Sequence, residues 1–101
     1  MQVFDLNTMK AKSYEQRDQN VFFEKPEFKT RIIELDAGGE MPDCEMESYV
    51  IFYVISGTVT VFVNGEAHQL EKGKCLITEP AVLSMKTNAG VKVMGVQIET
   101  G

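Results

Sequence analysis

The sequence predicts an all-β fold: a single jelly-roll β-barrel with about nine short strands and at most one short N-terminal helix. Turn-forming residues recur at short intervals, and the segments between them alternate in polarity with period two. In a chain of 101 residues, a sheet with this many strands must curl onto itself. The turn signals are Ala37-Gly38-Gly39, Ser56-Gly57, Asn64-Gly65, Lys72-Gly73 and Asn88-Ala89-Gly90.

One domain is expected to span residues 1–101, with an N-terminal arm and strands over residues 1–29 and the core barrel over residues 30–99. A short helix is predicted over Asn7–Tyr14, because Asn7 can cap its N-terminus and good helix formers follow. The remainder of the chain carries strand signals.

Two tight turns are predicted in the core barrel. Asn64-Gly65 tolerates positive φ at both residues, so a type I′ turn is expected to join strands over Thr58–Val63 and Glu66–Leu70. Gly73 is expected to end a second turn and to send a strand over Cys75–Thr78 back into the sheet.

Two further strands frame the core barrel. Residues 30–35 alternate, so that Arg31, Ile33 and Leu35 face one side of the predicted sheet. Val91–Glu99 is predicted to form a long terminal strand.

The charge and cysteine content of the chain indicate which binding partners and which cellular compartment to expect. The chain has 15 acidic and 10 basic residues and a net charge of −5, which is unsuited to nucleic acid or to an anionic membrane surface. The longest apolar run, Tyr49–Ile55, is too short to cross a bilayer, and the N-terminus shows no signal peptide. Cys44 and Cys75 are too few for a disulfide framework. A cytoplasmic protein with free thiols is therefore expected.

Gly39–Gly57 and Gly73–Met85 resemble the two motifs of small single-domain cupins. After a glycine-rich turn and a proline, Tyr53-Val54-Ile55-Ser56-Gly57 is similar to the family's YVLxG segment, and Leu70-Glu71-Lys72-Gly73 is similar to its LxxGD segment. The resemblance covers residues 30–99 and implies a cupin-like barrel.

The resemblance also identifies the positions where cupins carry the histidines and the glutamate that bind a metal ion. None of these positions holds His in this chain, so the resemblance implies degenerate metal-binding motifs, and no cofactor is expected. The glutamate position falls on Val50, the first two histidine positions on Asp43 and Glu45, Cys44 and Met46, or Glu45 and Glu47 according to the register, and the last histidine position on Met85.

Asp43, Glu45 and Glu47 share one face of the predicted strand. If that face looks into the barrel mouth, these carboxylates could hold a hard divalent cation or supply a general base. The alternative is a solvated strand edge, where charge discourages aggregation.

The two cysteines and the single histidine are the other residues that could bind a metal ion. Cys44 could bind Cu(I) together with Met46 or Met85, although free cysteine is most often a small buried residue. Cys75 is expected in the core. His68 matches no ligand position and is expected to be a partly exposed residue of a hairpin.

Apolar residues at barrel-lining positions predict either a ligand pocket or a filled barrel. These residues are Val50, Phe52, Val54, Met85, Met46, Phe62 and Met94. The candidate pocket residues are Glu45, Glu47, Val50, Phe52 and Met85.

Together these patterns predict a barrel that binds a small molecule as a sensor or accessory protein, with no catalytic residue assigned. One alternative is an isomerase-like or dioxygenase-like enzyme that uses the acidic cluster with a divalent cation. Another is a structural or protein-interaction domain. A homodimer is expected, because an apolar band can form and Asn20–Phe28 resembles the N-terminal strand that small cupins swap between subunits. The band consists of Tyr49, Tyr53, Phe22, Phe23 and Phe28.

Overall fold

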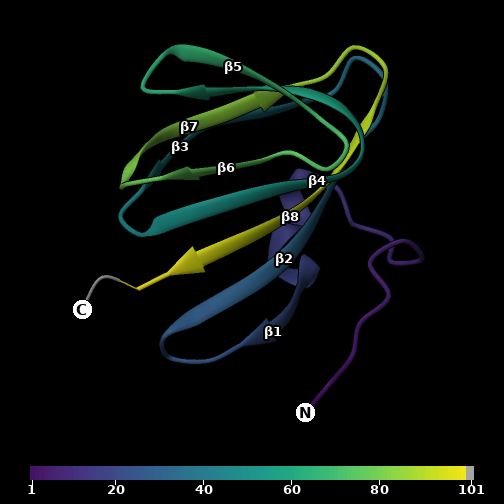
Figure 1. Cartoon of the computed structure of the whole chain (residues 1–101), viewed down its shortest axis with the longest axis vertical. Helices are drawn as coiled ribbons and strands as arrows, with labels where there is room; N and C mark the ends of the chain where they lie inside the picture. Colours follow the sequence, from purple (N-terminus) through teal and green to yellow (C-terminus); the bar gives the residue numbers. More distant parts are fainter. Residues whose placement is uncertain (100–101) are drawn as a thin grey trace.

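The computed structural model describes residues 1–99 of the chain (Figure 1). Within them it shows one 3-10 helix and eight strands, all paired antiparallel. The elements are η1 (Tyr14–Asn20), β1 (Val21–Glu24), β2 (Phe28–Leu35), β3 (Glu40–Met46), β4 (Tyr49–Val63), β5 (Glu66–Glu71), β6 (Cys75–Thr78), β7 (Ala81–Lys86) and β8 (Val91–Ile98).

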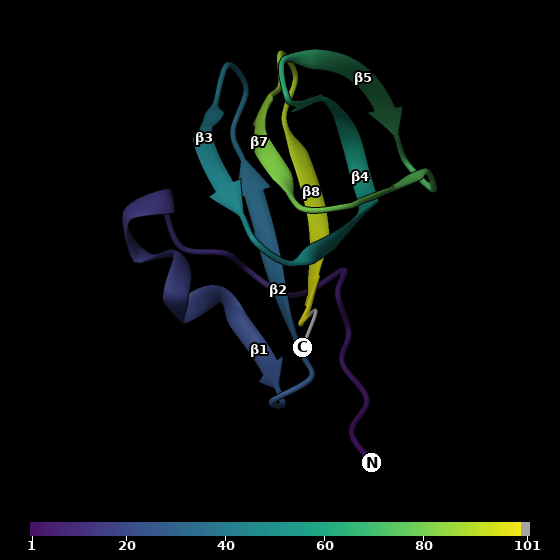
Figure 2. The same cartoon turned by 90° about the vertical axis from the view of Figure 1, so that its left-hand side faces the viewer.

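The strands form two sheets that share β4. The first sheet runs β1, β2, β8, the first half of β4 and then β6. The second runs β5, the second half of β4, β7 and then β3. Figure 2 shows how the strands curl around a common interior. This arrangement confirms the predicted all-β jelly-roll barrel.

β4 passes from one sheet to the other at Gly57. The residues before this point pair with β8, and Thr58–Val63 pairs with β5. The β8 pairing shifts register between Val54 and Ser56, which marks a β-bulge. The prediction of about nine strands agrees with the eight observed, and the difference arises because Ser56-Gly57 bends a single long strand and does not separate two.

Three predicted features of the barrel are confirmed. Asn64 and Gly65 have φ of 49° and 85°, as a type I′ turn requires, and they join β4 to β5. β6 spans Cys75–Thr78 as expected, and β8 spans Val91–Ile98, one residue shorter than predicted.

The predicted helix over Asn7–Tyr14 is wrong in position. Asp5 accepts hydrogen bonds from the Asn7 and Thr8 amides in a single turn, and the following residues are not helical. The helical segment is η1, which starts at Tyr14. A helix this short has little stability of its own, so hydrogen bonds to the barrel decide the path of the arm. No helix within residues 1–99 is long and apolar enough to cross a membrane.

The core lies between the two sheets and is apolar. Its most deeply buried residues come from four segments: both halves of β4, β7 and β8. Each has 2% or less of its surface exposed. They are Val50, Val54, Val61, Leu83, Met85 and Val93.

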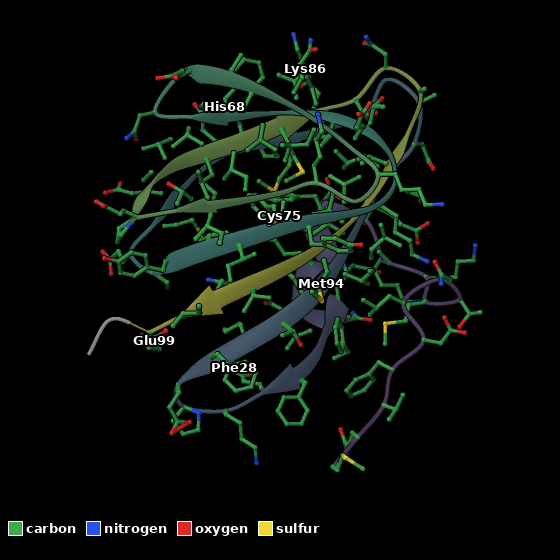
Figure 3. All side chains as sticks on the ribbon, viewed as in Figure 1. Phe28, His68, Cys75, Lys86, Met94 and Glu99 are labelled. Carbon is green, nitrogen blue, oxygen red and sulfur yellow. The ribbon has the colours of Figure 1, made fainter. Side chains whose placement is uncertain are left out.

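Three expectations about the interior are corrected. The β4 bulge moves the inward positions from even numbers to odd ones, so Val61 is buried while Phe62 lies outside and contacts Lys86. Met94 follows the fully buried Val93 and lies outside the buried core cluster (Figure 3). Cys75 is exposed, because it lies opposite Tyr53 on the outer face of the first sheet.

Candidate functional site

A cavity of about 190 Å³ lies between the two sheets, on the side where the N-terminal arm packs. Its walls are mainly apolar. The first sheet contributes Ile33, Leu35, Val50, Phe52 and Gly95, and the second contributes Met41, Cys44, Met46 and Leu83.

The arm and η1 form the polar rim of this cavity. Asn20 is buried, and its side chain accepts a hydrogen bond from the Lys12 amide at 2.6 Å and donates one to the Lys12 carbonyl at 3.1 Å. Arg17 lies over the Tyr14 ring, 4.2 Å from its centroid. Figure 2 shows η1 below β3 and beside β2. These contacts hold Lys12, Tyr14 and Arg17 at the rim.

The cationic Arg31 shares the inward face of β2 with Ile33 and Leu35 and lines the cavity with them. It lies directly opposite Gly95 of β8, and a Cβ at Gly95 would come within 3.5 Å of both the Arg31 side chain and Phe52. The Arg31 Nη2 donates to Gln97 Oε1 at 2.8 Å. Its Nε is buried and has no hydrogen-bond partner among residues 1–99. A buried donor left without a partner costs about 1–3 kcal/mol, so an acceptor that reaches the Arg31 Nε would be stabilised there.

Two sulfur atoms face Arg31's sheet from β3. The Cys44 thiol lies 3.4 Å from the Met46 sulfur, and both residues line the cavity. β3 has a bulge between Met41 and Cys44. Because of it, Met41, Cys44 and Met46 all face the interior, next to the residues of β7 with which they pair. Within the described part of the chain, no group of three His, Cys, Asp or Glu residues is placed to hold a metal ion.

The structure separates the predicted pocket residues. Val50 and Phe52 line the cavity. Met85 is buried in the core and is not part of the cavity wall. Glu45 and Glu47 are exposed and outside the cavity.

The remaining candidates lie outside the cavity as well. Asp43 is exposed, so the acidic cluster faces solvent, whereas Cys44 faces the interior. His68 is half-exposed on β5, with its Nε2 3.5 Å from a Glu66 carboxylate oxygen (Figure 3).

Sequence reasoning did not select Arg31, Gly95 or Gln97 as site residues. A signal for Arg31 was present, because an arginine shares a face with Ile33 and Leu35 on a strand whose inner face should be apolar. Gly95 and Gln97 gave no such signal, since their role depends on the register between β2 and β8.

Comparison with known proteins identifies the fold. The cupin domain of Cnp3 from Schizosaccharomyces pombe superposes with a TM-score of 0.77 at 20% identity, over 95% of this chain and 68% of that one. A conserved protein of unknown function from Streptococcus pyogenes gives 0.77 at 12% identity, over 99% and 89%. A cupin superfamily protein from Desulfitobacterium hafniense gives 0.72 at 8% identity, over 77% and 72%.

No protein-family model matches the sequence, and no curated protein matches it significantly. The chain thus has the cupin fold, as the resemblance of its two motifs predicted. Because these structural matches are distant in sequence, they establish the fold and leave the chemistry of the site to its own residues.

Proposed function

We propose that this protein binds a small, largely apolar molecule in the cavity between its sheets, as a sensor or an accessory protein, and that binding requires no metal ion. The supporting observation is the cavity itself, which has apolar walls on both sheets and a polar rim supplied by the arm. Ligand sites commonly combine apolar walls with a few placed polar groups.

The size of the cavity limits the ligand. An apolar cavity of about 150 Å³ is large enough for benzene. The volume of about 190 Å³ therefore suits a molecule with a body the size of one aromatic ring and a small substituent.

The chemistry of the walls favours binding without a metal. The cupin histidine positions hold other residues, and the groups that face the cavity include a thiol and two thioethers but no imidazole. An enzyme built on the acidic cluster has no observation in its favour, because Asp43 and Glu45 are exposed on the outer face of β3.

Toluene, which is neutral and the size of one ring, is a suitable probe for the cavity. We expect toluene to shift the backbone amide NMR signals of cavity residues such as Ile33 and Phe52, and to do so equally after metal chelation. Gly95→Val would place a branched side chain among the cavity residues and lower toluene affinity by about tenfold or more, equivalent to about 1.4 kcal/mol.

Gly95→Ala is the matched control, because its Cβ would make only ordinary contacts of 3.5–3.6 Å. Because it adds a single methyl group, it should lower toluene affinity by less than Gly95→Val does. No toluene binding by the parent, or equal binding by Gly95→Val, would contradict a ligand cavity. A stoichiometric transition metal in the purified protein, held inside the barrel, would contradict the metal-free site.

A further inference from the structure

We infer that the ligand carries a carboxylate and that Arg31 is the residue that binds it. This inference rests on the proposed function, since it concerns the same cavity. It is carried by one observation: a guanidinium in an apolar cavity has a buried Nε without a hydrogen-bond partner among residues 1–99.

The surroundings of Arg31 leave its charge unmatched. None of the ion pairs within residues 1–99 includes Arg31, and the one hydrogen bond of its guanidinium there goes to the neutral amide of Gln97. Two carboxylates, of Asp18 and Glu34, also belong to residues that line the cavity. Glu34 Oε1 is already engaged, since it accepts a hydrogen bond from the Ala11 amide at 2.8 Å.

A carboxylate matches these donors in geometry as well as in charge. Arginine presents a planar pair of N–H groups that can bind both oxygens of one carboxylate. The Gln97 side chain already accepts from Arg31 Nη2 through its oxygen, so its NH₂ group remains a donor for the same anion. A phosphate dianion would demand more donors than these largely apolar walls offer.

Gly95 is what makes room for this arrangement. The absent side chain leaves the space between Arg31, Phe52 and Ile33 open, with each of the three about 3.5 Å from the position a Cβ would take. An apolar body can therefore pack on Phe52 and Ile33 while its carboxylate reaches the guanidinium. The ligand class is a monocarboxylic acid with a body about the size of one aromatic ring.

The first test compares benzoate with benzamide, which has the same ring and no charge. We expect the parent to bind benzoate about tenfold more tightly than benzamide, by calorimetry at neutral pH. Arg31→Met should remove this preference while benzamide affinity stays within about twofold. Lys72→Met is the matched control: it removes one positive charge from an exposed residue outside the cavity and should keep the preference. Arg17→Met removes the charge at the rim and tests whether the anion binds there instead.

A second measurement uses the parent protein alone, so it stands even if Arg31→Met does not fold. The chain has two arginines, Arg17 and Arg31, and hence two Nε–H signals in a ¹⁵N spectrum. Benzoate should shift the Arg31 signal strongly, and benzamide should not.

The outcomes separate this inference from the proposed function. The carboxylate inference is overturned if the parent binds toluene and benzamide but does not prefer benzoate to benzamide. It is also overturned if Arg31→Met still prefers benzoate to benzamide. In both cases the apolar cavity stands. If the preference disappears in Arg17→Met, the anion binds at the rim and the inference is overturned. If none of the three probes binds, both fail together.

Discussion

Gly57 shows how one residue can set the shape of the barrel. Its φ is 82°, and a Cβ at this position would lie against the Gly90 carbonyl oxygen and 2.9 Å from the Val91 Cα. The bend of β4 therefore depends both on a positive φ and on backbone contact with the segment before β8. The backbone contact leaves no room for a Cβ, and the positive φ adds to the preference for glycine.

Gly57→Ala should destabilise the protein by about 4 kcal/mol or more, the range reached by the most disruptive single substitutions. Gly38→Ala is the matched control, because Gly38 has a φ of 79° but no atom within 4 Å of its Cβ position. Gly38→Ala should lower the free energy of unfolding by only about 1–2 kcal/mol, the cost of placing a residue with a Cβ at a positive φ. Urea denaturation of both variants checks this, and equal losses would show that the Gly90 contact has no energetic weight.

At the scale of elements, the alternation of side chains was predictable wherever a strand is regular. The faces of β2, the turn after β4 and the bounds of β6 follow from short-range patterns. The inward positions of β4 after Ile55 did not follow, because a bulge adds one residue and reverses the alternation. Phe62 was assigned to the wrong face for this reason.

The N-terminal arm was unpredictable for a different reason. Its path is fixed by side chains distant in sequence: Glu34 binds the Ala11 amide, Asn20 binds Lys12, and the buried Lys92 donates to the Asn7 carbonyl. Local propensity cannot report such contacts. Arg31 gave a sequence signal, since it shares a face with Ile33 and Leu35, but its unpartnered Nε is visible only once β2 and β8 are paired.

Asn20→Ala should therefore release the arm without unfolding the barrel. It removes two hydrogen bonds at a buried position, which we expect to cost about 1–3 kcal/mol. In hydrogen exchange, the Lys12 amide should lose its protection while β4 and β8 keep theirs. Asn88→Ala, at an exposed asparagine, is the control and should change neither. Unchanged protection at Lys12 would mean that Asn20 does not hold the arm.

At the scale of the whole molecule, the outer face of the first sheet is apolar across three neighbouring strands. Paired positions on β6, β4 and β8 lie directly opposite one another and so share a face. Several of these side chains are exposed, including Ile77 at 67% and Tyr49 at 43%. Of the phenylalanines predicted to join this band, Phe22 and Phe23 instead pack with Phe4, and Phe28 stacks on Phe23. The residues of this outer face are Cys75, Ile77, Tyr49, Ile51, Tyr53, Met94, Val96 and Ile98.

A strand with apolar residues on both faces is typical of a sheet that is covered on both sides. β4 has this character over Tyr49–Ile55, although the barrel interior covers only one of its faces. We propose that a second copy of the chain covers the other face. Two such sheets would meet through the same patch in each subunit, as a twofold dimer requires.

Ile77→Asp tests this dimer without touching the core. At 67% exposure, Ile77 contributes little to the stability of a single chain, so a charge there should leave the barrel folded. In the dimer it would be buried without a partner, and we expect the dimer dissociation constant to rise by about a hundredfold or more. Val82→Asp is the matched control, because Val82 is 38% exposed on β7 of the other sheet and should leave the dimer intact. Sedimentation equilibrium of the three proteins measures the effect. A monomeric parent would contradict the dimer. An Ile77→Asp protein as dimeric as the parent would place the interface elsewhere.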